Sequence, residues 1–152
     1  MPRRVRGDIM AAFSIFEGVG AMPKELNISI KRIYEPASDG DGCRILVDRL
    51  WPRGVSKERA HLDEWMKDVA PSNALREWFH HEDAHFAAFS ERYEAELSND
   101  EEKRADVAKI IERSRKTHVT LLYGAKDPAE NQAAVLLKHI AHVAGSGSGA
   151  HE

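Results

Sequence analysis

The residues best suited to chemistry lie directly after two apolar runs of the sequence. Asp48 and Arg49 follow the first run, and Arg53 comes four residues later, after a proline. Lys126 and Asp127 follow the second run. Arginine and lysine bind carboxylates and phosphates through charge-assisted hydrogen bonds, and an aspartate can orient an arginine or accept a proton. These residue types indicate a site for a small anionic ligand, with Asp48 as a candidate catalytic acid or base.

The two apolar runs and a third segment are predicted to be β-strands. The three segments span residues 28–34, 44–50 and 118–123. Continuous apolar runs are typical of strands that are covered on both faces, as in a parallel sheet. Helical periodicity fills the spacings between them, so the connections are predicted to be right-handed crossovers. The expected fold is a single three-layer α/β/α domain with a small, mainly parallel sheet.

Helices are predicted where apolar residues recur every three or four positions. The apolar faces consist of Leu62, Trp65, Met66 and Val69; Leu75, Trp78 and Phe79; Phe86, Phe89, Tyr93 and Leu97; Val107, Ile110 and Ile111; and Leu136, Leu137, Ile140 and Val143. Ser98 and Glu101 have the spacing of a capping box, which predicts the start of the fourth helix. Asp127 at the N-cap, followed by Pro128 and Glu130, predicts the start of the fifth.

This architecture predicts that the charged residues meet. Ligands of open α/β sheets bind outside the carboxyl ends of the strands. Asp48 and Arg49 end one predicted strand and Lys126 follows another, so parallel strands bring them to the same edge. The free N–H groups and the positive dipole end of the last helix point at that edge and favour an anion. Arg53 is expected to reach the same crevice from beyond Pro52.

Each candidate residue also has a structural explanation. The charge pair at the end of the second strand could be a structural ion pair. Trp51 belongs to the candidate ligand-binding residues, but a core aromatic residue is the favoured interpretation. Asp127 and Asn131, the last two candidate ligand-binding residues, could serve as helix caps. Lys126 has no comparable structural role and is therefore the more informative residue.

The composition limits the classes of protein to which the chain can belong. It has 152 residues, of which 42% are hydrophobic and 31% charged, as is typical of one soluble globular domain. The formal net charge of −3 provides no general attraction to nucleic acid or to an acidic membrane surface. The single cysteine, Cys43, excludes an intrachain disulfide and fits a reducing, cytoplasmic location. No apolar run is long enough to span a bilayer, so no membrane partner is expected.

Neither a cofactor nor a metal is expected from the motifs of the sequence. The Walker phosphate loop, the dinucleotide-binding fingerprint and the nucleophile elbow are absent. His81 and His85 are one helical turn apart, as are His139 and His142. A third ligand and the glutamate of a zincin motif are missing, which favours solvated helix positions over a metal site.

Three segments are expected along the chain. Residues 1–21 are predicted to form a loosely ordered N-terminal extension, for which a secretory signal is the less favoured alternative. Residues 22–144 are predicted to form the α/β domain. Residues 145–152 are rich in glycine and serine and are predicted to form a flexible tail.

Four stretches of the chain stand out: RIYEPASDGDGCRILVDRLWPRGVSKE, LDEWMKDVAPS, LREWFHH and LLYGAKDPAENQAAVL. They resemble the YeaO-like proteins, a bacterial group within the domain-of-unknown-function family 488. The resemblance covers about residues 27–140, and its most specific parts are DRLWPRG and AKD followed by Asn131. It implies a small cytoplasmic α/β protein without an established activity.

Three classes of function remain open. The first is an enzyme that acts on a small anionic or nucleotide-like substrate, with Asp48 as acid or base and the neighbouring cations as charge stabilisers. The second is a binding module that senses such a ligand without chemistry. The third is a domain that interacts with protein or nucleic acid. Nucleic acid is the least favoured partner, because acidic residues dilute the basic patch of residues 53–59. The oligomeric state is left open.

Overall fold

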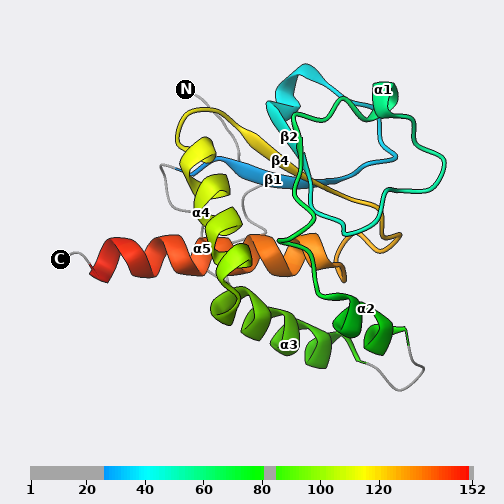
Figure 1. Ribbon diagram of the computed structural model, residues 1–152. Coiled ribbons are helices and arrows are strands. Elements are labelled where there is room, and N and C mark those ends of the chain that lie inside the picture. The colour runs from blue at the N-terminus through cyan, green and yellow to red at the C-terminus, as the bar shows by residue number, and fades with distance from the viewer. Residues whose placement is uncertain (1–25, 81–84, 151–152) are drawn as a thin grey trace.

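The computed structural model describes residues 26–80 and 85–150 of the chain (Figure 1). Within them, four parallel strands form a sheet in the order β1-β4-β2-β3. The strands are β1 (Ile28–Arg32), β2 (Cys43–Leu46), β3 (Glu64–Trp65) and β4 (Val119–Tyr123). All five residues of β4 are buried, because β4 lies between β1 and β2. A small parallel sheet in a single α/β domain confirms the predicted fold class.

Helices cover the two faces of the sheet unequally. They are α1 (Lys57–Ala60), α2 (Asn73–Phe79), α3 (Phe86–Asn99), α4 (Glu101–Ser114) and α5 (Gln132–Ala150), with a 3-10 turn, η2 (Asp39–Asp41), before β2. The long helices α3, α4 and α5 lie together on one side of the sheet, and α2 extends this layer (Figure 1). The single-turn helix α1 lies on the other side. The larger core therefore forms under the long helices.

Alternation along the strands sorts their side chains onto the two faces. Val47 and Leu121 point to the long helices and belong to the main apolar core. Leu46 and Leu122 point the other way and pack against Ala60 of α1 in a smaller apolar cluster. The layer on this second face is thus the segment between β2 and β3, with one helical turn, rather than a set of long helices.

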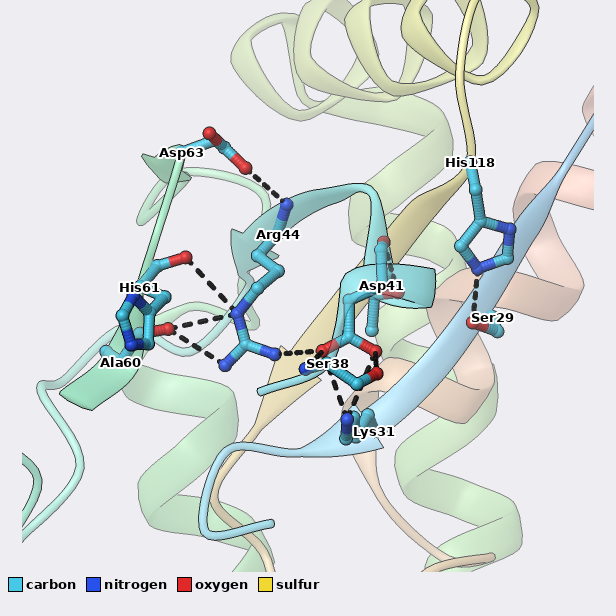
Figure 2. Close-up of polar contacts among 10 residues, drawn as sticks. Ser29, Lys31, Ser38, Asp41, Arg44, Ala60, His61, Asp63 and His118 are labelled. Atoms are coloured by element: carbon cyan, nitrogen blue, oxygen red, sulfur yellow. Dashed lines mark hydrogen bonds and ion pairs between the residues drawn. The ribbon is translucent and has the colours of Figure 1, made fainter. Parts of the chain in front are cut away.

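The second face also carries a buried charge cluster around Asp41 (Figure 2). The Asp41 carboxylate accepts hydrogen bonds from Lys31 Nζ (3.0 and 3.1 Å), from Ser38 N (3.0 Å) and from Arg44. Burial raises the pKa of Asp41, but these hydrogen bonds outweigh it and hold the pKa at about 2. Arg44 also donates from Nη2 to Ala60 O (2.8 Å). The cluster therefore ties β1 and β2 to α1.

The segment 62–69 is not the predicted helix. It contains β3, which pairs with β2, and Met66 N donates to Leu46 O (2.9 Å). Trp65 belongs to the cluster on the second face, where its Nε1 donates to Asp48 O (2.7 Å), whereas Met66 belongs to the main core. Because apolar residues lie on both faces of this short strand, their spacing in the sequence resembles the apolar spacing of a helix. Pairing with the free edge of β2 decides the local structure.

The boundary between α3 and α4 also differs from the prediction. α3 continues to Asn99, so Ser98 lies within it, and the predicted capping box of Ser98 with Glu101 is wrong. Asp100 is the N-cap of α4, and its side chain accepts a hydrogen bond from Lys103 N (3.0 Å). An aspartate cap also places a negative charge at the positive end of the helix dipole.

The expected terminal segments are only partly described. The predicted N-terminal extension, residues 1–21, lies outside the described residues. α5 continues to Ala150, into the segment 145–152 for which a flexible tail is predicted. On this helix Val143 is 37% exposed and Ala144 is buried in its place. Among the helices of the described part, none is long and apolar enough to cross a membrane.

Candidate functional site

A cavity of about 270 Å³ lies at the carboxyl edge of the sheet. It is bounded by the segment after β2, by α2 and α3, and by the segment that leads into α5. Its polar lining residues are Asp48, Arg49, Arg76, His80, Glu130, Asn131 and Gln132. This is the edge at which ligands of parallel α/β sheets bind. We call it the carboxyl-edge cavity.

Asp48 joins the ends of three elements at this edge. Its Oδ2 accepts a hydrogen bond from Gly124 N (2.9 Å) directly after β4, and its Oδ1 accepts one from Gln132 Nε2 at the start of α5. A Cβ at Gly124 would lie 3.1 Å from Asp48 Oδ2, so a glycine allows this close approach. Burial raises the pKa of Asp48 to about 6, although the two hydrogen bonds and the charge of Arg76 act in the opposite direction. The carboxyl group therefore titrates close to neutral pH.

Arg49 is held by main-chain oxygens. Its Nε donates to Pro71 O (3.0 Å) and its Nη2 to Ala70 O (3.4 Å). The structural ion pair with Asp48 that the sequence allowed is not formed. Neutral carbonyl groups use two of the five N–H donors and do not neutralise the charge, so Arg49 can still bind an anion in the carboxyl-edge cavity.

α2 and its C-cap residue contribute two basic side chains that are absent from the predicted site. Arg76 and His80 are four residues apart and line the same cavity. This spacing places two side chains on one helix face, and it is the signal that could have identified them. Phe79 of the same helix stacks on Phe89 of α3, with ring centroids 4.3 Å apart, and both rings line the cavity. The basic groups therefore stand beside an apolar wall.

The start of α5 lies four residues beyond the predicted position. Asn131 is the cap: its Oδ1 accepts a hydrogen bond from Ala134 N (2.8 Å), and its Nδ2 donates to Asp127 O (2.8 Å). Asp127 caps a separate turn, in which its Oδ1 accepts from Ala129 N (2.8 Å) and Glu130 N (3.0 Å). These backbone hydrogen bonds lower the pKa of Asp127. The prediction that Asp127 is the N-cap of the last helix is thus wrong. The buried Asn131 takes that role.

The structure brings together three of the predicted site residues, Asp48, Arg49 and Asn131, and leaves the others outside the cavity. Trp51 packs edge-on against Trp65 in the cluster on the second face, with ring centroids 5.2 Å apart. The remaining three are exposed; they are Arg53, Lys126 and Asp127. They follow β2 and β4 in the chain but do not line the cavity.

The described residues contain no group of three or more histidine, cysteine, aspartate or glutamate side chains placed to hold a metal ion. Of the histidine pairs in the sequence, His81 lies outside the described residues. His139 is buried in α5, and burial lowers its pKa. The solvated helix position that the sequence favours for His139 is therefore wrong.

Comparison with known proteins shows the family of the chain. The family described as "Inactive DUF488-N3 subclade" matches residues 27–147. The uncharacterized protein YeaO of Escherichia coli is 49% identical over 111 residues, which are 73% of this chain and 94% of YeaO. Uncharacterized proteins of Mycobacterium bovis and Mycobacterium tuberculosis are 42% identical over 115 residues, which are 76% of this chain and 94% of theirs. No solved structure matches. The chain belongs to the DUF488 family, which confirms the resemblance to its YeaO-like group.

Proposed function

We propose that this DUF488 protein binds a small anionic ligand in the carboxyl-edge cavity and that no chemistry takes place on the ligand there. The observation that carries the proposal is that Arg49, Arg76 and His80 line one cavity beside the start of α5. Guanidinium groups bind carboxylates and phosphates through paired, charge-assisted hydrogen bonds. The free N–H groups in the first turn of α5 add a positive partial charge at the same place.

The charge of the cavity lining depends on the protonation of Asp48. When Asp48 is protonated, Glu130 alone opposes the two arginines among the described lining residues. When Asp48 is ionised, the acidic and arginine charges balance. Because the pKa of Asp48 is about 6, an anion should bind more tightly below that pH than above it. Binding should therefore be accompanied by proton uptake near neutral pH.

The cavity also limits the size and character of the ligand. Its volume of about 270 Å³ lies just below the usual range for small-molecule sites, which is about 300–1,000 Å³. The stacked rings of Phe79 and Phe89 offer an apolar surface next to the basic groups. A small carboxylate or phosphate ester with a planar or apolar group fits this combination.

Two observations favour binding without chemistry in the carboxyl-edge cavity. The matching family is described as inactive. Both carboxyl oxygens of Asp48 already accept hydrogen bonds, from Gly124 and Gln132, so the group is engaged in holding the edge together. The alternative is an enzyme in which Asp48 is a general acid or base, and a pKa of about 6 favours that role. Turnover of a small ester that Asp48→Asn abolishes without loss of binding would establish this alternative.

Calorimetric titration with inorganic phosphate, benzoate and a nucleoside monophosphate tests the proposal. Arg76→Ala should weaken the binding of the best probe by about tenfold or more, since a charge-assisted hydrogen bond is worth about 1.5–3 kcal/mol. Arg53→Ala is the matched control, because Arg53 is exposed at the same edge but does not line the cavity. The Arg53→Ala protein should bind the best probe with the same affinity as the wild type. If the wild type binds none of the probes, or if both variants lose affinity equally, the proposal is wrong.

A further inference from the structure

The amino edge of the sheet holds a serine, a histidine and an asparagine in hydrogen-bonded series. Ser29 Oγ lies 2.8 Å from His118 Nε2, and His118 Nδ1 lies 2.6 Å from Asn27 Oδ1. Figure 2 shows the contact between Ser29 and His118 beside the Asp41 cluster. Ser29 and His118 are half-buried and Asn27 is exposed, so the group lies close to the surface. The group lies at the opposite ends of the strands from the carboxyl-edge cavity.

The parallel register of β1 and β4 produces this arrangement. Ser29 pairs with Thr120, so His118 lies beside Asn27, and Val119 N donates to Asn27 O (2.8 Å). Alternate residues of a strand point to the same face. The imidazole of His118 is therefore placed between the side chains of Asn27 and Ser29.

The orientation of the Asn27 amide assigns the proton of the imidazole. With Oδ1 facing His118, Asn27 accepts a hydrogen bond and the ring proton is assigned to His118 Nδ1. His118 Nε2 then offers its lone pair to the hydroxyl of Ser29. Burial lowers the pKa of His118, although Asp41 acts to raise it, so the neutral form of the imidazole is favoured. A neutral imidazole of this tautomer is what a general base requires.

We propose that Ser29 is a nucleophile that transfers acyl groups from small activated esters to water, with His118 as general base and Asn27 as a positioning residue. Ser29 Oγ forms a bond to the ester carbonyl carbon while its proton passes to His118 Nε2. The ester C–O bond breaks, and the alcohol leaves with that proton. Water then attacks the acyl-serine and gives a proton to His118. The carboxylic acid is released, and Ser29 regains its proton.

The identity of the third residue restricts the substrate. Asn27 is neutral, so it orients the imidazole but does not offset the charge of protonated His118 as a carboxylate would. The transition state is therefore stabilised less than in a triad with an acidic member. This difference restricts the reaction to esters with good leaving groups, such as aryl esters.

A fluorophosphonate probe tests the nucleophile directly. The Ser29 Oγ–P bond forms as the P–F bond breaks, fluoride leaves, and the serine proton passes to His118. Peptide mapping by mass spectrometry should find the adduct on Ser29, and Ser29→Ala should abolish it. Ser56→Ala is the matched control, since it removes an exposed hydroxyl that caps α1, and it should be labelled like the wild type.

Two further substitutions separate the roles of the partner residues. His118→Gln keeps a polar side chain but removes the base, and it should slow labelling by about a hundredfold or more. Asn27→Val should also slow labelling, whereas Asn27→Asp, which accepts from the same Nδ1–H, should restore at least the wild-type rate. Thermal melts of all variants exclude unfolding as the cause. Labelling of Ser29 that is no faster than that of Ser56, or that His118→Gln leaves unchanged, would overturn the proposal.

Discussion

Replacement of Asp48 by asparagine should stabilise the protein at neutral pH. Asp48 has a pKa of about 6 in the folded protein, against an ordinary value of 3.8, chiefly because burial disfavours its charged form. Asparagine has the same shape and does not ionise. Its Oδ1 can accept from Gly124 N, and its Nδ2 can donate to Gln132 Oε1 once the glutamine amide is reversed. Both contacts that close the carboxyl edge are thereby retained.

The size of the effect follows from the difference between the two pKa values of Asp48. The unfolded chain loses the proton near pH 3.8 and the folded protein near pH 6. Between these values the folded state holds more proton, so its stability falls as the pH rises. The full shift corresponds to about 3 kcal/mol, most of which should be lost between pH 4 and pH 8. Asp48→Asn should lack this component of the pH dependence.

Urea unfolding followed by tryptophan fluorescence between about pH 4 and pH 8 measures the free energies of unfolding of both proteins. Other titrating groups are common to both proteins and cancel in the difference. Asp127→Asn is the matched control, because the pKa of this exposed carboxyl is lowered by backbone hydrogen bonds from Glu130 and Ala129. The ionised Asp127 carboxyl contributes its full stabilisation already well below neutral pH. The free energy of unfolding of the control should therefore depend on pH as that of the wild type does between pH 6 and pH 8. A constant difference between wild type and Asp48→Asn across the whole range would refute the reasoning.

Two further substitutions test how the domain is held together, and urea unfolding measures both. Asn131→Ala removes the side-chain cap of α5 and should lower the free energy of unfolding by about 1 kcal/mol; no loss would mean that Asn131 does not cap the helix. Arg44→Met removes the guanidinium group that binds both Asp41 and Ala60 O and leaves a buried carboxylate partly uncompensated. It should cost about 3 kcal/mol or more, and an Arg44→Met protein as stable as the wild type would show that this cluster does not hold α1.

The sequence identifies the edge of the sheet more reliably than the residues that line its cavity. Asp48 and Arg49 could be placed because the end of a buried strand is visible as the end of an apolar run. Arg53 follows a turn, and the direction of its side chain depends on contacts that no periodicity encodes. Arg76 and His80 reach the cavity because α2 docks there through the contact of Phe79 with Phe89. That docking is a tertiary contact between two helices, and the periodicity of neither helix encodes its geometry.

The two edges of the sheet show the same limit of prediction from the sequence. At the carboxyl edge, Asp127 and Asn131 are both good N-cap residues, and the burial of Asn131 decides which of them starts α5. At the amino edge, Ser29 and His118 are 89 positions apart, and only the register of β1 with β4 brings them together. Composition and periodicity predict which segments are strands. They do not predict which residues of two strands stand side by side.

The stability cost of Asp48 bears on its function. The carboxyl group joins the ends of β2 and β4 to the start of α5, and this structural role explains why a polar side chain stands there. An asparagine could make both contacts without ionising, and it would avoid a loss of about 3 kcal/mol at neutral pH. Structure alone therefore does not require an acid at this position. An ionisable group that lowers stability inside a cavity with Arg49 and Arg76 supports the proposed binding of an anion, in which release of the proton would change the charge that the ligand meets.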